Sequence, residues 1–260
     1  MSKIVRLLQS IVANPVEAAL YIPEHVGMRH EYRPCYEPEP DWELQLHNWF
    51  GAAWPCPEYA ALDALWRNIA SELQAQGLRF GRQTYGEYSD AEASLAHAVL
   101  CTVLHKRPSV VLETGVARGV TSRIVLEALI RNDQGHLWSI DLPHPFEKKL
   151  HGQTGAVVPA SHRVRWSYIE GSSRRRLPSL LRLLGRIDLF IHDSLHTARN
   201  TRFEMERTLS AMAPRGIMIV DDIGTHQGFA DFARDFPSLE TLVCQHSDRP
   251  GSFFGLVHVQ

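Results

Sequence analysis

Cysteine is scarce in this chain of 260 residues, and its four copies are scattered: Cys35, Cys56, Cys101 and Cys244. No two of them form a Cys-x-x-Cys pair, so their spacing carries neither a zinc-binding signature nor a disulfide framework. Scattered cysteines of this kind are typical of proteins from a reducing compartment. We therefore expect a cytoplasmic protein without structural disulfides.

Long apolar runs and an excess of one charge are also missing. No stretch of about 18 apolar residues occurs, so no membrane-spanning helix is expected. The 27 basic and 29 acidic residues nearly balance, whereas nucleic-acid-binding domains usually have a basic excess. Residues 1–20 begin with basic residues, but Gln9, Ser10 and Asn14 interrupt the apolar positions. That pattern favours an amphipathic helix over a signal peptide, and neither membranes nor nucleic acids are expected partners.

The chain has the composition of an ordinary globular protein, with 44% hydrophobic and 22% charged residues. Its first 80 residues contain proline-rich and aromatic stretches and no regular strand pattern. One segment, residues 58–76, has apolar side chains at helical spacing, namely Leu62, Leu65, Trp66, Ile69 and Leu73. We interpret residues 1–80 as a helical cap or lid region and residues 81–260 as the main domain.

From about residue 89 onward, strand-like and helix-like segments alternate. Short apolar runs predict strands at 109–115, 136–143, 164–171, 187–193 and 216–222. Two further strand-like runs near the C-terminus predict a hairpin. This order predicts an α/β fold with a doubly wound, Rossmann-like, mostly parallel sheet, an antiparallel C-terminal hairpin and an N-terminal helical cap.

Acidic residues stand at the end of nearly every predicted strand. They are Glu113, Asp141, Glu170, Asp193, and Asp221 with its neighbour Asp222. Ligands of doubly wound sheets bind at the carboxyl ends of the strands, where these side chains would gather. Solvated loop residues do not readily explain acids at five successive strand ends, so the pattern predicts one site.

The sequence ETGVARGVTS, residues 113–122, predicts a glycine-containing turn between a strand and a helix. Gly115 permits a tight turn, and Gly119 lets a ligand approach the start of the helix, where free N–H groups attract anions. The spacing is Gly-x-x-x-Gly, so the dinucleotide fingerprint Gly-x-Gly-x-x-Gly is absent. A plain strand-to-helix turn would explain the glycines alone. Asp141 at the end of the next strand strengthens the ligand interpretation, because its carboxylate can accept hydrogen bonds from both hydroxyls of a ribose.

These motifs resemble those of the class I S-adenosylmethionine-dependent methyltransferases. VVLETGVARGVTS is similar to the first motif of that fold and LWSIDLP to its second. The resemblance covers about residues 85–260 and implies that S-adenosylmethionine is the cofactor. It places the methionine and ribose part of the donor beside Glu113, Gly115, Gly119, and Thr121 or Ser122. By the same resemblance Asp141 would hold the ribose and Ser172 would lie beside the adenine, while Tyr88 and Asp193 are further candidates for the donor pocket.

The acids that follow the fourth and fifth predicted strands suggest a second component of the site. Asp193, Asp221 and Asp222 offer carboxylate oxygens from neighbouring strand ends, and such a set suits a hard cation such as Mg²⁺. A divalent ion of this kind could bind a substrate hydroxyl, lower its pKa and orient it. Taken alone, Asp221 and Asp222 could instead cap the following helix.

A narrower resemblance concerns Asp193, His196 and the Asp221–Asp222 pair. This arrangement resembles the Mg²⁺-dependent O-methyltransferases of the catechol, macrolide-sugar, aminocoumarin-sugar and cephalosporin types. The resemblance implies that the acids bind Mg²⁺ and that His196 is the general base, a task that suits histidine because it titrates near neutral pH. His192 should point to the opposite face of its strand and pack there. His196 could also simply pack beside the next helix.

Together these features predict a Mg²⁺-dependent O-methyltransferase that acts on a hydroxyl of a small molecule, such as a sugar of a glycoside or natural product. A metal-independent methyltransferase of the same fold, a nucleotide-dependent oxidoreductase and a non-catalytic ligand-binding protein are the alternatives. The long loop 144–162 and the aromatic stretch 30–57 are candidate lids. Self-association into a homo-oligomer stays open.

Overall fold

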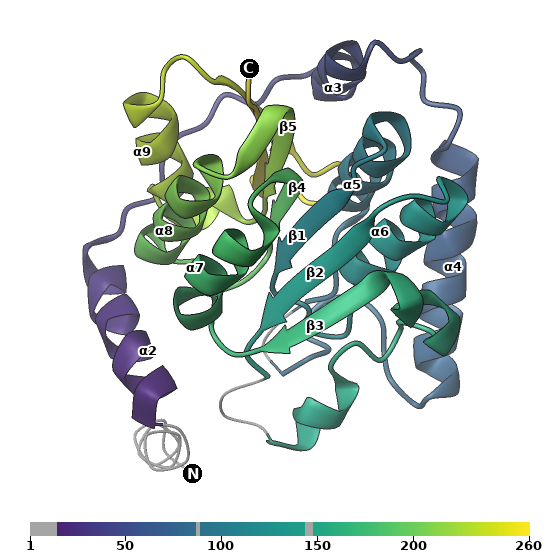
Figure 1. Ribbon diagram of the computed structural model, residues 1–260, viewed down its shortest axis with the longest axis horizontal. Coiled ribbons are helices and arrows are strands. Elements are labelled where there is room, and N and C mark those ends of the chain that lie inside the picture. The colour runs from purple at the N-terminus through teal and green to yellow at the C-terminus, as the bar shows by residue number, and fades with distance from the viewer. Residues whose placement is uncertain (1–14, 87–88, 144–147) are drawn as a thin grey trace.

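A seven-stranded sheet forms the centre of the computed structural model, which describes residues 15–86, 89–143 and 148–260 (Figure 1). The strand order is β3-β2-β1-β4-β5-β7-β6. In chain order the strands are β1 Val110–Thr114, β2 His136–Asp141, β3 Trp166–Glu170, β4 Ile187–His192, β5 Met212–Val220, β6 Glu240–Gln245 and β7 Phe253–His258. The first five strands pair in parallel, and β7 lies antiparallel to both β5 and β6. The predicted mixed sheet with a C-terminal hairpin is confirmed.

Helices cover both faces of the sheet (Figure 1). The α-helices are α2 Pro15–Gly27, α3 Trp42–Phe50, α4 Tyr59–Ala75, α5 Ala93–Lys106, α6 Val120–Arg131, α7 Ser173–Leu184, α8 Ala198–Leu209 and α9 Gly228–Asp235. Short 3-10 helices are η1 Met28–His30, η2 Lys148–Gln153, η3 Ala160–Arg165 and η4 Ile223–Thr225. Helices α4, α5 and α6 lie on one face, and α7, α8 and α9 lie on the other. Within the described ranges, no helix has the length and apolarity needed to cross a membrane.

Alternation along the central strands explains this layering. Successive side chains of a strand point to opposite faces. In β4, Leu189 and Ile191 join the hydrophobic cluster under α5 and α6, whereas Phe190 joins the cluster under α7, α8 and α9. All three side chains are fully buried. Strands that are apolar on both faces are typical of parallel sheets with helices on each side, which is the arrangement seen here.

The N-terminal helices α3 and α4 pack into the same core as the main domain. Trp42 and Leu46 of α3 and four apolar residues of α4 belong to the cluster that includes α5 and α6. The buried residues of α4 are Leu62, Leu65, Ile69 and Leu73, which the sequence places at helical spacing. These helices are therefore built onto one face of the sheet.

The strand order places a switch point at β1. The chain moves outward from β1 through β2 to β3, then returns to the other side of β1 as β4. In such sheets the two halves diverge above the switch point, and ligands bind in the resulting crevice at the carboxyl ends of the strands. In this chain the switch point lies between β1 and β4.

Candidate functional site

The carboxyl ends of β2, β1, β4 and β5 lie side by side, held by backbone hydrogen bonds just beyond the strands. Gly115 N donates to Ile140 O at 2.9 Å, and Asp193 N donates to Thr114 O at 2.8 Å. Asp221 N donates to His192 O at 2.9 Å. The residues that directly follow three neighbouring strands are therefore fixed in one row, as the sequence predicts.

Gly115 brings the turn after β1 against the end of β4. Its φ is +86°, and a Cβ at this position would lie 1.8 Å from the carbonyl oxygen of Asp193. Only glycine combines this backbone conformation with such a close approach. The glycine-containing turn and the acid of β4 thus form one structural unit.

Gly119 is the N-cap residue of helix α6 and has a φ of +85°. The space that a side chain would fill there is occupied by another part of the protein and not by an open ligand pocket. A Cβ there would lie 3.0 Å from Val158 Cγ2 and 3.1 Å from Gly155 Cα. The same loop donates backbone hydrogen bonds to the turn, from Gly155 N to Ala117 O and from Val157 N to Arg118 O. The described part of the long loop is therefore fastened to the turn, and the predicted contact between Gly119 and a ligand stays a prediction.

Glu113 is fully buried near the end of β1, and hydrogen bonds reach only one of its two carboxylate oxygens within the described residues. Its Oε2 accepts hydrogen bonds from the hydroxyls of Ser122 at 2.7 Å and Ser139 at 2.6 Å. Its Oε1 is buried with no hydrogen-bond partner among the described residues. Burial raises the pKa of Glu113 to about 7, against the lowering effect of the two serine hydroxyls.

Asp141 ends β2 beside the same turn. Burial raises the pKa of Asp141 to about 6, although backbone N–H groups of Val116, Ala117 and Leu142 act to lower it. Asp141 O accepts a hydrogen bond from Gly171 N at 2.8 Å, which ties β2 to the start of helix α7. The carboxylate therefore lies over the glycine-containing turn.

Ser172 is the N-cap residue of α7 and follows Gly171 directly. Its backbone N–H donates to Glu17 Oε1 at 3.3 Å, and its hydroxyl oxygen is buried without a hydrogen-bond partner in the described part of the chain. The structure thus places Ser172 next to Asp141, while Tyr88 lies outside the described residues.

Three of the four predicted metal and base residues meet at the ends of β4 and β5, and Asp222 lies beside this group. One ligand atom each from Asp193, His196 and Asp221 lie within 4.8 Å of one another. His196 Nε2 is 3.7 Å from Asp193 Oδ1 and 3.9 Å from Asp222 Oδ2. Burial raises the pKa of Asp193 well above its ordinary value, and the negative charges of Asp221, Glu113 and Asp222 raise it further. Several carboxylates thus lie close together here, and the positive charge near them is too small to balance their negative charges.

His196 and Thr121 both face this cluster. His196 lies in the loop between β4 and α8, directly before Thr197, whose hydroxyl caps α8 by accepting from Asn200 N at 3.1 Å. The Nδ1 atom of His196 is buried and has no hydrogen-bond partner in the ranges that the structure describes. Thr121 Oγ1 donates to Asp193 Oδ2 at 3.4 Å, so the first turn of α6 also reaches the acids.

His192 is packed, as predicted from its position in the strand. It is fully buried, with Nδ1 2.6 Å from Glu204 Oε2 and Nε2 3.0 Å from Thr201 Oγ1. Burial acts to raise the pKa of Glu204, but the charge and hydrogen bond of His192 and two hydroxyls lower it to about 2. Ser194 Oγ donates to the same carboxylate at 2.8 Å. This network fixes the residues on both sides of Asp193, and the sequence analysis missed Glu204.

His246 is a second residue that the sequence analysis missed. It is almost fully buried, with Nε2 3.6 Å from Asp221 Oδ1 and Nδ1 3.0 Å from Glu92 Oε2. Burial alone would lower the pKa of His246, but these two carboxylates raise it to about 9. A protonated His246 supplies the positive charge that keeps the pKa of Asp221 below its ordinary value, together with His196. No spacing in the sequence links these three segments.

Comparisons with known proteins find a methyltransferase-domain match and similar solved structures. Residues 112–223 match a family model described as a methyltransferase domain. The O-methyltransferase TomG of Streptomyces achromogenes, solved with S-adenosylmethionine, is similar with a TM-score of 0.55 at 15% identity, over 85% of this chain and 96% of that one. The Bacillus cereus O-methyltransferase, solved with S-adenosylhomocysteine, gives a TM-score of 0.55 at 14% identity, over 85% and 97% of the two chains.

A third similar structure is the Podospora anserina methyltransferase PaMTH1, with a TM-score of 0.54 at 12% identity, over 88% of this chain and 100% of that one. No curated protein matches the chain by sequence. The chain therefore has the fold of the class I S-adenosylmethionine-dependent methyltransferases, and residues 112–223 match a methyltransferase-domain model. The fold predicted from the two sequence motifs is confirmed.

Proposed function

We propose that the protein is a Mg²⁺-dependent O-methyltransferase that methylates a hydroxyl of a small molecule with S-adenosylmethionine as the donor. One observation carries the proposal. The turn at Gly115 touches the backbone of Asp193, and the side chain of Asp193 belongs to the cluster with His196 and Asp221. A donor bound over the turn would thus lie directly beside the groups that can activate an acceptor.

The residues around the turn fit the donor. Glu113 Oε1 and Ser172 Oγ are buried polar atoms without hydrogen-bond partners in the described residues, and buried polar atoms normally have them. Asp141 provides a carboxylate at the position expected to hold a ribose. When bound, S-adenosylmethionine supplies a methyl group already activated for displacement, so the protein has to align it with an oxygen nucleophile.

His196 is the residue proposed to take the proton of the acceptor hydroxyl. Its Nε2 lies between the carboxylates of Asp193 and Asp222, which would stabilise the imidazolium that forms. As the oxygen forms its bond to the methyl carbon, the carbon–sulfur bond breaks and the proton remains on His196. The hydrogen-bonded cap at Thr197 holds the histidine loop in place for this step.

Asp193, Asp221 and Asp222 are the residues proposed to hold Mg²⁺, which would bind the acceptor oxygen and favour its deprotonation. The raised pKa of Asp193 supports this assignment. It reflects burial and repulsion between neighbouring carboxylates, and both effects penalise an ionised cluster that no cation balances.

A metal-independent methyltransferase is the second candidate, and His246 is the observation that favours it. Its protonated ring lies 3.6 Å from Asp221 Oδ1 and already provides one positive charge at the acids. In that version Asp193 and Asp222 would serve only to orient His196.

The acceptor class and the setting are also part of the proposal. The resemblance noted in the sequence favours a sugar hydroxyl of a glycoside or natural product. The structurally similar TomG is an O-methyltransferase involved in tomaymycin synthesis. The four cysteines are free thiols, which supports a reducing cytoplasm. Neither nucleic acid nor membrane is a proposed partner, and self-association remains to be measured.

Calorimetric titration with S-adenosylmethionine tests the donor site. We expect binding to the wild type and its loss in Asp141→Ala, since the ribose hydroxyls would lose their acceptor. Asp235→Ala is the matched control, because Asp235 lies on α9 and makes surface ion pairs only within the described residues. A wild type that binds no donor at millimolar concentration would refute the proposal.

Activity measurements with and without metal test the second component. A methyl-transfer screen over sugars, catechols and amines, with Mg²⁺ added or withheld, should show transfer to a hydroxyl acceptor only when the metal is present. Excess chelator or Asp221→Asn should abolish the transfer while donor binding persists. Full activity in excess chelator would contradict the Mg²⁺ requirement and support the metal-independent methyltransferase.

A further inference from the structure

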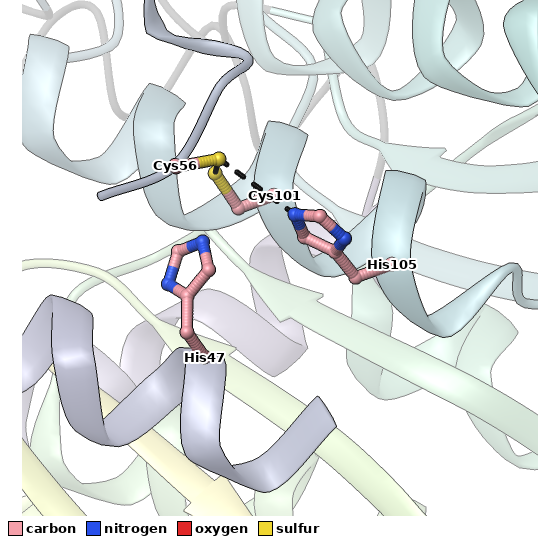
Figure 2. A group of neighbouring side chains, drawn as sticks. All are labelled: His47, Cys56, Cys101 and His105. Atoms are coloured by element: carbon pink, nitrogen blue, oxygen red, sulfur yellow. Dashed lines mark hydrogen bonds between the residues drawn. The ribbon is translucent and has the colours of Figure 1, made fainter. Parts of the chain in front are cut away.

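Two cysteines and two histidines meet in a cluster that the methyltransferase proposal does not use (Figure 2). They are His47 from α3, Cys56 from the segment between α3 and α4, and Cys101 and His105 from α5. One ligand atom from each lies within 4.8 Å of the other three. Figure 2 shows the four side chains pointing toward one another from three separate segments.

Local structure explains how distant residues reach this point. Cys101 and His105 are four residues apart in α5, so they share one face of that helix. Helix α3 ends directly after His47, at Phe50, and Ala52 N donates back to His47 O at 3.0 Å. This turn reverses the chain and brings Cys56 back toward the helix. Because the ligands come from three separate segments, their spacing in the sequence carries no zinc signature, and only the folded chain brings them together.

His47 is already arranged as a metal ligand. It is 2% exposed, and its Nδ1 lies 2.7 Å from Glu43 O, to which it can only donate. That bond leaves the lone pair on Nε2, and Nε2 is buried without a hydrogen-bond partner in the described residues. A backbone carbonyl that holds one ring nitrogen while the other is left to a metal is the usual environment of metal-bound histidines.

The two thiols complete a compact site in which three of the residues are buried and His105 is partly exposed. Cys56 and Cys101 are each 4% exposed, and none of the four cysteines is in a disulfide. Their Sγ atoms are 3.0 Å apart, and Cys56 Sγ is 3.7 Å from His105 Nε2. Zinc–ligand bonds of about 2.0 to 2.3 Å in a tetrahedron separate the ligand atoms by about 3.3 to 3.8 Å. The thiol pair therefore has to open by less than an ångström to reach that spacing, and all the ligand atoms already lie within 4.8 Å of one another.

We propose that His47, Cys56, Cys101 and His105 bind one Zn²⁺ ion in a closed, structural site. Sulfur and imidazole ligands in a tetrahedron select zinc over the hard cations that suit the carboxylates elsewhere in the protein. Binding releases one proton from each thiol to the solvent, and the two thiolates then balance the charge of the ion. A site with zero net charge is compatible with burial among the rings of Trp54 and Phe50.

The site has a structural role because of the segments that it joins. It would cross-link α3 and the segment around Cys56 to α5, and all four coordination positions are taken by protein. It also lies apart from the proposed active site. Helix α5 ends at Lys106 and leads into the start of β1, whereas the acids stand at the opposite, carboxyl ends of the strands. The zinc site is thus independent of the magnesium proposal.

Metal analysis of the whole protein tests the site. Protein purified without chelator, or reduced and reconstituted with Zn²⁺, should contain about one zinc ion per chain. Elemental mass spectrometry measures this zinc content. Cys101→Ser and His47→Gln should each lose most of it. Cys244→Ser removes a buried cysteine outside the cluster and should keep it. Asp221→Asn should also keep it, which separates this site from the proposed magnesium site.

Cobalt substitution provides a readout that does not depend on stability. Co²⁺ in the wild type should show the visible absorption of a tetrahedral ion and a thiolate charge-transfer band. Cys56→Ser should weaken that band, and Cys244→Ser should leave it unchanged.

Two outcomes would overturn the proposal. One is reduced wild-type protein that binds zinc and cobalt at well under a tenth of an equivalent after reconstitution. The other is freshly purified, unreduced protein with only two titratable thiols of four, recovered by reductant, which would assign Cys56 and Cys101 to a disulfide.

Discussion

Glu113 combines full burial, two serine hydroxyl donors and a pKa raised to about 7 from the usual 4.5. At a pH between these two pKa values, the folded state retains a proton that the unfolded chain has released. The free energy of unfolding therefore falls as the pH rises through this range. We expect Glu113→Gln to remove this part of the pH dependence. Relative to the wild type, the variant should gain stability from pH 5 to 8, by at most about 3 kcal/mol.

Urea unfolding at pH 5, 6, 7 and 8 measures this difference. Glu37→Gln is the control, because Glu37 is exposed and should leave the profile of the wild type unchanged. A constant offset between wild type and Glu113→Gln across the series would contradict the assigned ionisation.

His246 is expected to compete with a metal ion for Asp221. Its ring is protonated at neutral pH because Asp221 and Glu92 raise its pKa to about 9, and a cation 3.6 Å from Asp221 repels a second cation. We expect His246→Gln to bind Mg²⁺ several-fold more tightly than the wild type, measured by the metal concentration that gives half-maximal methyl transfer. Lower activity with no change in that concentration would instead favour the metal-independent version.

Local sequence signals predict some of the residues of the site and not others. Asp193, Asp221 and His196 could be predicted because each lies at or just after the end of an apolar strand, and parallel strand ends meet at one edge. His246 and Glu92 come from a hairpin and a helix start that approach Asp221 only in the folded chain. Glu204 is one turn after Asn200 on α8, and nothing in its spacing distinguishes it from an exposed glutamate.

At the scale of elements, the turn between β1 and α6 depends on Gly115. We expect Gly115→Ala to push the turn away from β4, since its Cβ would overlap the Asp193 carbonyl oxygen. Both donor binding and methyl transfer should fall by more than tenfold. Gly77→Ala is the matched control, because Gly77 also has a positive φ, +72°, but a Cβ there meets nothing within 4 Å.

The control should cost only about 1 kcal/mol of backbone strain and leave donor binding intact. Calorimetry and thermal unfolding of both variants distinguish the effects. Equal losses in the two variants would mean that φ strain alone, and not contact with Asp193, accounts for the result.

Element boundaries show where local patterns mislead. Ser89 and Asp90 are good N-cap residues, but α5 begins only at Ala93. The Asp90 carboxylate instead accepts hydrogen bonds from Gly81 N and Thr84 Oγ1, both at 2.9 Å. Asp90 is a good capping residue, but its carboxylate is bonded to the preceding loop and does not cap the helix. The strands were more predictable, because burial on both faces leaves a continuous apolar run.

At the scale of the whole molecule, the N-terminal segment lies across the edge of the sheet and reaches both faces (Figure 1). Helix α2 packs on α8, Glu39 N donates to Val243 O of β6 at 2.8 Å, and α3 packs on α5. Neither periodicity nor turn residues could predict this path, because it is set by pairings between distant segments. The sequence analysis could identify the helical character of this segment but not its attachment.

Glu24 of α2 links this segment to the proposed base. It is 2% exposed, its Oε1 is 2.6 Å from Arg174 Nη2, and its Oε2 accepts from Thr197 Oγ1 at 2.8 Å. Thr197 directly follows His196. We expect Glu24→Gln and Glu24→Ala both to lower stability by about 2 kcal/mol, because each removes the buried carboxylate that pairs with the partly exposed Arg174.

Activity should separate the two variants. Glutamine retains an oxygen that can accept from Thr197, so Glu24→Gln should keep most of the methyl-transfer rate, whereas Glu24→Ala should lose about tenfold through displacement of the His196 loop. The comparison requires assays well below the unfolding temperature of each variant, with donor binding measured in parallel. If both variants transfer methyl groups at the same rate, α2 contributes stability alone. If only Glu24→Ala is slow while its donor affinity is unchanged, the N-terminal helix positions the base through the contact between Glu24 and Thr197.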